Sequence, residues 1–162
     1  MAVALPVALN MAPRILGVGN RHRGDDGVGP YVLAGLAGRL PAEQLLAAEG
    51  EGSGLIDIFA REPDLILVDA ADAPAAGLAP GAVRRMDAGD PDLGSCGLRA
   101  STHALGVAEA IALARSLDAL PERLRVIAMG GSEFAPGTGL SEPVARAADA
   151  LIEELAGICA DA

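Results

Sequence analysis

One apolar run near the middle of the chain limits the possible folds more than any other segment. Residues Leu65 to Val68 are all apolar, and the run stops at Asp69. Strands with one solvated face alternate apolar and polar residues, whereas a continuous run is typical of a strand covered on both faces. The run therefore predicts an interior strand of a sheet that lies between layers of helices.

The rest of the chain alternates between strand-like and helix-like patterns. The expected strands cover 14–18, 45–49, 65–68, 82–86 and 125–129. The expected helices cover 30–40, 55–61, 103–117 and the segment after Ser141, and loops rich in Gly and Pro cover 72–80, 87–99 and 130–140. This alternation predicts a three-layer α/β/α domain with a mainly parallel sheet.

Two of the expected helices have a capping residue and an apolar face. Ser101 or Thr102 is expected to cap the helix over 103–117, and Ser141 is expected to cap the last helix. Apolar residues at helical spacing should face the core. They are Leu105, Ala108, Ile111, Ala112 and Leu117 in the former helix, and Val144, Ala148, Leu151, Ile152 and Leu155 in the latter.

The length of 162 residues, of which 51% are hydrophobic, suits one domain with a core. We expect this single domain over residues 14–160, preceded by an N-terminal arm over 1–13 that is disordered or dispensable. The arm is apolar, but no positive charge precedes its apolar part and Pro6 interrupts it. We therefore expect neither a signal peptide nor a membrane span.

Charge and composition exclude several kinds of partner and site. The formal charge is −10, and the chain has no Trp, one Tyr and two Phe, so neither nucleic acid nor an anionic membrane is an expected partner. Cys96 and Cys159 are far apart and no CxxC motif occurs, which argues against a structural zinc site. We expect a cytoplasmic protein with two reduced thiols.

The loop over 17–30, GVGNRHRGDDGVGP, follows the first expected strand as a phosphate-binding loop would. A dinucleotide fingerprint needs a third glycine where the chain has His22, and paired aspartates would repel a pyrophosphate. No GK[ST] sequence occurs in the chain. The loop is therefore predicted to present Asp26 to a site, with Asp25 as a supporting neighbour that caps the next helix. Arg21, His22 and Arg23 are hypothesised to line the rim of a partner interface.

Three residues whose side chains could bind metal or transfer protons are expected to meet at one edge of the sheet. In open α/β sheets, sites form beyond the carboxyl ends of strands, so Asp26 and Asp69 share a crevice if the first and third strands are neighbours. Asp69 directly follows a buried strand, where a carboxylate needs a hydrogen-bonding or charged partner, or a bound cation. His103, at the start of an expected helix, would be neutral and able to bind metal. The three residues could bind a divalent metal or perform acid–base chemistry without one.

Four motifs follow one another along the chain with a recognisable order and spacing. They are Gly17-Val-Gly-Asn20 with Gly24-Asp-Asp-Gly-Val-Gly29, Leu65-Ile-Leu-Val-Asp-Ala70, Ser101-Thr-His-Ala-Leu-Gly106, and Phe134-Ala-Pro-Gly-Thr-Gly-Leu-Ser141. Together they resemble the motifs of the maturation endopeptidases of nickel–iron hydrogenases. The resemblance covers about residues 14–155.

This resemblance implies a fold, a reaction and a partner. The implied fold is a twisted, mostly parallel five-stranded sheet between helices. The implied reaction removes a C-terminal extension from a hydrogenase large-subunit precursor after nickel has been inserted. By position, Asp26, Asp69 and His103 would be the catalytic and metal-contacting residues. The nickel would belong to the substrate, so no tightly bound cofactor is expected, and the enzyme is expected to be a monomer.

The chain departs from the family pattern at two places. Glu51 stands where family members usually have a glycine, and Gly130-Gly131 stands where many have an acid or amide followed by proline. Both departures leave the three site residues intact and bear on the choice of substrate. Two other functions stay open at this point: a metallohydrolase with its own zinc, and a non-catalytic module that recognises a metallated partner.

Overall fold

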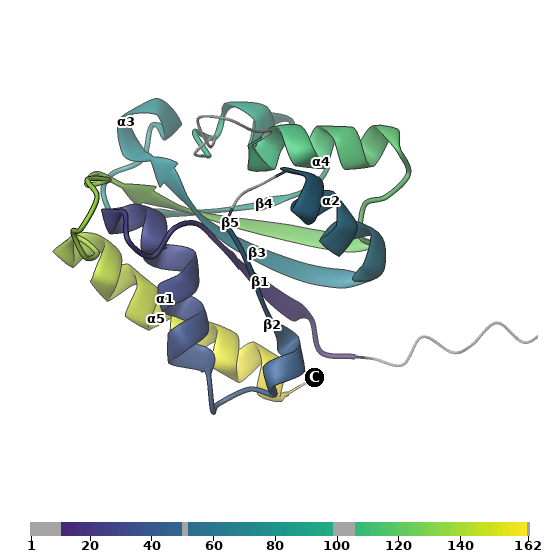
Figure 1. Ribbon diagram of the computed structural model, residues 1–162, viewed down its shortest axis with the longest axis horizontal. Helices are drawn as coiled ribbons and strands as arrows, with labels where there is room; N and C mark the ends of the chain where they lie inside the picture. Colours follow the sequence, from purple (N-terminus) through teal and green to yellow (C-terminus); the bar gives the residue numbers. More distant parts are fainter. Residues whose placement is uncertain (1–10, 50–51, 99–105, 162) are drawn as a thin grey trace, which may run out of the picture.

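The computed structural model describes residues 11–49, 52–98 and 106–161, and its strands form one five-stranded sheet in the order β2-β1-β3-β5-β4 (Figure 1). The first four of these run parallel, and β4 lies antiparallel to β5 at one edge. The strands are β1 (Arg14–Val18), β2 (Leu45–Ala48), β3 (Asp64–Asp72), β4 (Val83–Asp87) and β5 (Arg123–Gly131). The predicted mainly parallel sheet is confirmed, and β1 and β3 are neighbours, as a shared site requires.

Helices cover both faces of the sheet, which confirms the three predicted layers. One face is covered by α1 (Val28–Leu36) and α5 (Glu142–Ala160), and the other by α2 (Gly52–Arg61) and α4 (Val107–Ser116) (Figure 1). The connections contain the short helix α3 (Ala73–Ala76) and the 3₁₀ helices η1 (Gly24–Gly27), η2 (Ala42–Gln44) and η3 (Pro91–Ser95).

The apolar run Leu65–Val68 lies in β3, between two hydrophobic clusters. Leu65 and Leu67 pack toward α2 and α4, whereas Ile66 and Val68 pack toward α1 and α5. All four side chains are at most 2% exposed. Burying an aliphatic side chain of this size contributes about 1.5–3 kcal/mol. The run therefore joins the two halves of the core, as its composition predicts.

The glycines of β1 and α1 let the helix approach the strand closely. A Cβ atom on Gly17 would lie 2.6 Å from the carbonyl oxygen of Gly29, and one on Gly29 would collide with the backbone of Val18. Real Cβ atoms do not come this close to backbone. Glycine, which has no Cβ atom, is thus required at both positions for α1 to pack on the sheet.

Several element boundaries differ from the predictions. β3 continues past Asp69 to Asp72, because Ala70 to Asp72 pair with the last residues of β5. The predicted loop after it contains α3, whose first turn is capped by Asp72 Oδ1, which accepts a hydrogen bond from Ala75 N at 3.1 Å. α1 begins at Val28 and ends at Leu36, so it lies slightly earlier than expected.

The apolar face predicted for the helix over 103–117 is partly wrong. Its expected caps and first residues, with Leu105 and His103, lie outside the described residues, and α4 begins at Val107 with Gly106 before it. The buried positions of α4 are Val107, Ala110, Ile111 and Ala114. Ala112 and Leu117 are exposed, because the burial follows a helical stripe offset from the one expected.

The apolar face of the last helix is confirmed. Its five predicted residues, Val144, Ala148, Leu151, Ile152 and Leu155, are all buried. Ser141 occupies the residue before α5, as expected of a cap, but its hydroxyl makes no hydrogen bond to the helix. It donates instead to Asp25.

Candidate active site

Asp26 lies in η1, just beyond the carboxyl end of β1, and its side chain is half-buried. Its Oδ2 accepts a hydrogen bond from Asn20 N at 2.8 Å, which fixes the carboxylate against the start of the same loop. Gly19 makes this turn with φ of 128°, a conformation that favours glycine, and a Cβ there would collide with the carbonyl oxygen of Asp26. The loop that carries Asp26 is therefore tightly folded.

Asp25 has a different environment from its neighbour. Its side chain is fully buried and does not cap α1, so the predicted capping role is wrong. Its Oδ2 accepts from Ser132 N, Glu133 N and Ser141 Oγ, each at 2.9 Å, and its Oδ1 accepts from Ser141 N at 2.7 Å. Four donors compensate for the burial of the carboxylate. Asp25 thus ties the β1–α1 loop to the loop over 132–141.

Close contacts with neighbouring segments explain why glycine occupies positions 130 and 131, where the chain departs from the pattern of the similar family. A Cβ atom on Gly131 would lie 2.8 Å from the Cβ of Asp25, and one on Gly130 would lie 2.7 Å from the carbonyl oxygen of Ala79. The end of β5 therefore passes too close to two other segments for a side chain. No local sequence pattern predicts these contacts, because both neighbours are far away along the chain.

Asp69 lies on β3, opposite Ala128 of β5, and is 2% exposed. Its Oδ1 accepts a hydrogen bond from Ala70 N at 2.8 Å. The nearby Cys96 is fully buried, and burial raises the pKa of its thiol, with the negative charge of Asp69 acting in the same direction. A raised pKa keeps this thiol protonated and poorly nucleophilic. Cys96 is therefore a core residue beside the site.

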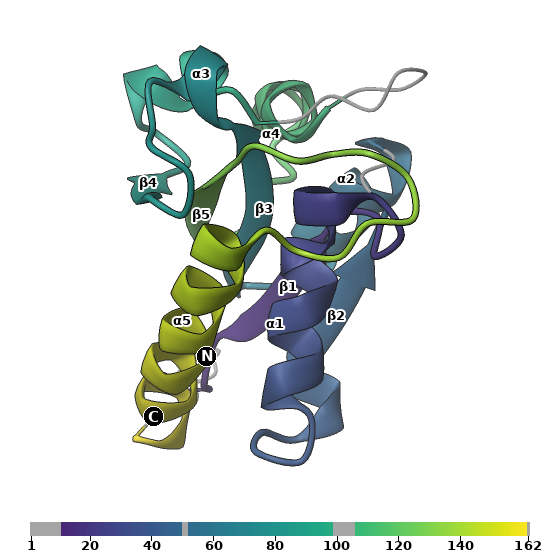
Figure 2. The same ribbon diagram turned by 90° about the vertical axis from the view of Figure 1, so that its left-hand side faces the viewer.

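The structure brings the two predicted carboxylate-bearing segments together. η1, which carries Asp26, contacts β3, which carries Asp69, at the edge of the sheet where β1 and β3 end. Figure 2 shows this edge, with the start of α1 and the loop over 132–141 lying above it. His103 lies outside the described residues, so its role stays a prediction. Among the described residues, no three His, Cys, Asp or Glu side chains cluster closely enough to hold a metal ion.

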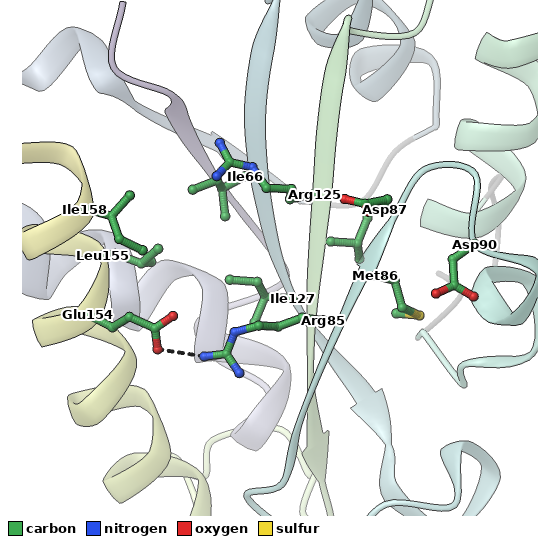
Figure 3. A pocket seen from close by; sticks show the side chains of 11 residues that line it. Ile66, Arg85, Met86, Asp87, Asp90, Arg125, Ile127, Glu154, Leu155 and Ile158 are labelled. Atoms are coloured by element: carbon green, nitrogen blue, oxygen red, sulfur yellow. Dashed lines mark hydrogen bonds and ion pairs between the residues drawn. The ribbon is translucent and has the colours of Figure 1, made fainter. Parts of the chain in front are cut away.

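A cavity of about 290 Å³ lies elsewhere, between α5 and the strands β4 and β5 (Figure 3). Its wall includes Ile66 and Arg125, which pair with each other near the amino ends of β3 and β5. Arg85 and Glu154 form an ion pair of 2.6 Å beside it. Neither Asp26 nor Asp69 lines this cavity, so the cavity is separate from the candidate site.

None of the helices in the described part of the chain is both long enough and apolar enough to cross a bilayer.

Comparison with known proteins identifies the family. The family model of hydrogenase maturation proteases, HycI, matches residues 41–158, a segment that includes Asp69 and begins after Asp26. A search among curated proteins finds no significant match.

Solved structures of such proteases share the fold. The hydrogenase maturating endopeptidase HybD from E. coli is 23% identical, with a TM-score of 0.70 over 90% of each chain. The [NiFe] hydrogenase maturation protease HybD from Thermococcus kodakarensis is 21% identical, with a TM-score of 0.65 over 92% of this chain and 99% of that one. The hydrogenase 2 maturation peptidase from Thaumarchaeota archaeon SCGC_AB-539-E09 is 28% identical, with a TM-score of 0.58 over 88% and 95% of the two chains. The chain therefore belongs to the hydrogenase maturation protease family and is an endopeptidase of the hydrolase class.

Proposed function

We propose that this endopeptidase removes a C-terminal extension from the large-subunit precursor of a nickel–iron hydrogenase after nickel has been inserted. Asp26, Asp69 and His103 would contact the nickel, which belongs to the substrate. The observation that carries the proposal is the contact between η1 and β3, because it brings the loop of Asp26 to the strand of Asp69 at one edge of the sheet. Membership of the family supplies the reaction class.

The double duty of the three candidate ligands supports a metal that arrives with the substrate. A resident catalytic zinc has three well-placed protein ligands with supporting hydrogen bonds. Two carboxylates and one imidazole that must also perform catalysis form a poorer site for a free ion. A site of this kind is completed only when a metallated partner docks, which couples recognition of the mature precursor to cleavage.

The chemistry needs a polarised carbonyl and an oriented water molecule. The substrate's nickel would polarise the scissile carbonyl. One carboxylate, either Asp26 or Asp69, would accept a proton from the attacking water, whose oxygen bonds to the carbonyl carbon. The peptide C–N bond then breaks, and the departing amine takes up a proton. The burial of Asp69 would strengthen its attraction to a metal cation, because charges interact more strongly away from water.

The length of the intervening chain is compatible with a role for His103 beside Asp69. Leu98 forms a bridge with Ala71, two residues beyond Asp69 on β3. His103 follows Leu98 by five residues, and an extended chain spans at most about 3.5 Å per residue. This length leaves room for the proposed role of His103 and does not place the residue.

We also propose that the enzyme has no tightly bound cofactor and that it works in the cytoplasm. Cys96 and Cys159 are free and buried on opposite sides of the sheet. Unpaired thiols are typical of proteins in a reducing compartment.

The proposal is tested with three variants of the site, Asp26→Asn, Asp69→Asn and His103→Ala. Each is mixed with nickel-loaded precursor, and the release of the C-terminal peptide is followed by intact-mass spectrometry. We expect each variant to cleave at least about 10²-fold more slowly than the wild type, because an acid–base group or a metal contact is lost. Asp87→Asn, which alters an exposed aspartate on β4, is the control and should cleave normally. Normal processing by all three site variants would contradict the proposed function.

A further inference from the structure

The proposed reaction leaves one feature of the β1–α1 loop unused. Arg21, His22 and Arg23 are exposed at its tip, in a chain with a formal charge of −10. Neither arginine makes an ion pair or side-chain hydrogen bond with any residue that the structure describes. Most other described arginines are engaged. Arg14, Arg39, Arg85, Arg123, Arg125 and Arg146 form ion pairs, and Arg61 and Arg115 donate to backbone carbonyls.

The backbone of this cationic tip is held in place. His22 N donates to Asn20 Oδ1 at 2.8 Å, and Arg23 N donates to Asn20 O at 3.1 Å. Gly137 N donates to His22 O at 2.8 Å, which attaches the tip to the loop over 132–141. The side chains therefore project from a preformed turn, and a partner that binds them need not order the backbone.

The tip is part of the rim of the candidate site. Arg23 precedes Asp26 by three residues, and Asp26 N donates to Arg23 O at 3.1 Å. The neighbouring loop over 132–141 (Figure 2) has exposed, uncharged residues at 135–137 and one exposed carboxylate, that of Glu133. A substrate segment that reaches Asp26 would thus pass a local positive charge on an otherwise acidic enzyme.

We infer that Arg21, His22 and Arg23, the cationic tip, bind a short acidic segment of the protein substrate beside its cleavage site. The inference rests on the proposed function and adds the chemistry of the partner. An extended polyanion such as nucleic acid or an anionic membrane would meet the acidic remainder of the surface and be repelled. A short acidic peptide segment meets the tip alone. Electrostatic attraction of this kind raises the rate of encounter and weakens with added salt.

The test compares Arg21→Gln/Arg23→Gln with the control Arg61→Gln/Arg115→Gln, which loses the same charge at the opposite end of the sheet. The substrate is the nickel-loaded precursor. At about 20 mM NaCl, where exposed charges are weakly screened, we expect the tip variant to lose about tenfold in kcat/KM. The loss should lie in KM with kcat unchanged. At about 500 mM NaCl the difference from wild type should shrink to about twofold or less. The control should stay within about twofold of wild type at both salt concentrations.

The dissociation constant of each protein for the same precursor is measured in parallel, and thermal unfolding confirms that both variants are folded. A tip variant that matches the control in kcat/KM and in affinity at low salt would overturn the inference while the proposed function stands. A wild-type protein that binds the precursor without cutting it would overturn the proposed function. The dissociation constants of the tip variant and the control would then decide whether the cationic tip binds the precursor. Absence of any binding by the wild type would overturn both.

Discussion

At the scale of single residues, two adjacent aspartates of the same loop have opposite roles. Asp25 is fully buried and accepts four hydrogen bonds from the loop over 132–141, whereas Asp26 is half-buried beside the site edge. The sequence predicts Asp26 as the site residue and Asp25 as its support, and the structure agrees that Asp25 is a supporting residue. The sequence alone could not predict which segment Asp25 supports, because the groups that donate hydrogen bonds to it are more than 100 residues away.

Replacing Asp25 with alanine should destabilise the protein by about 3 kcal/mol, because three backbone N–H groups lose a charged acceptor. Urea unfolding followed by circular dichroism measures this change. Asp87→Ala, at an exposed position of β4, is the matched control and should change the free energy of unfolding by about 0.5 kcal/mol or less. Equal urea midpoints for the two variants would show that Asp25 does not hold the loops together.

At the scale of elements, the end of β5 and the loop after it determine how the site edge is closed. Gly131 lies directly against Asp25, and Phe134 packs on the α1–α5 side of the core. The pairing of β3 with β5 continues to Asp72 and Gly131, so the last strand delivers this loop beside the β1–α1 loop. The two loops thus form one unit, although they are far apart in sequence.

Gly131→Ala should destabilise the protein by about 1–3 kcal/mol, because the new Cβ overpacks the junction. The added atom would lie 2.8 Å from both Asp25 Cβ and Phe134 Cζ. Gly89→Ala is the control, since a Cβ there meets no atom within 4 Å. Thermal unfolding of both variants provides the comparison. A melting temperature for Gly131→Ala as high as that of the control would mean that the contact between β5 and Asp25 is looser than described.

The elements themselves were predictable where burial follows a simple pattern. The run Leu65–Val68 predicts an interior strand, and the apolar stripe of α5 is confirmed at every predicted position. The buried stripe of α4 is offset from the predicted one. Alanine occurs on both the buried and the exposed face of this helix, so it does not show which face is buried. The continuation of β3 past Asp69 depends on pairing with β5, which no local pattern contains.

At the scale of the whole molecule, the topology explains why a site could be predicted at all. Placing β1 beside β3 brings the loop of Asp26 to the strand of Asp69, so two of the three predicted site residues share one edge of the sheet. His103 lies outside the described residues, and its part in the site stays a prediction. The match to the family covers residues 41–158, so it includes Asp69 and not the loop of Asp26.

The proposed dependence of cleavage on nickel carried by the substrate can be measured with one set of reactions. The purified, dialysed wild-type protein is analysed for bound metal and then incubated with the precursor large subunit, either loaded with nickel or free of it, and the masses of the products are determined. We expect the dialysed protein to hold no stoichiometric metal and only the nickel-loaded precursor to lose its C-terminal peptide. Stoichiometric zinc in the dialysed protein, or equal cleavage of both precursors, would contradict it.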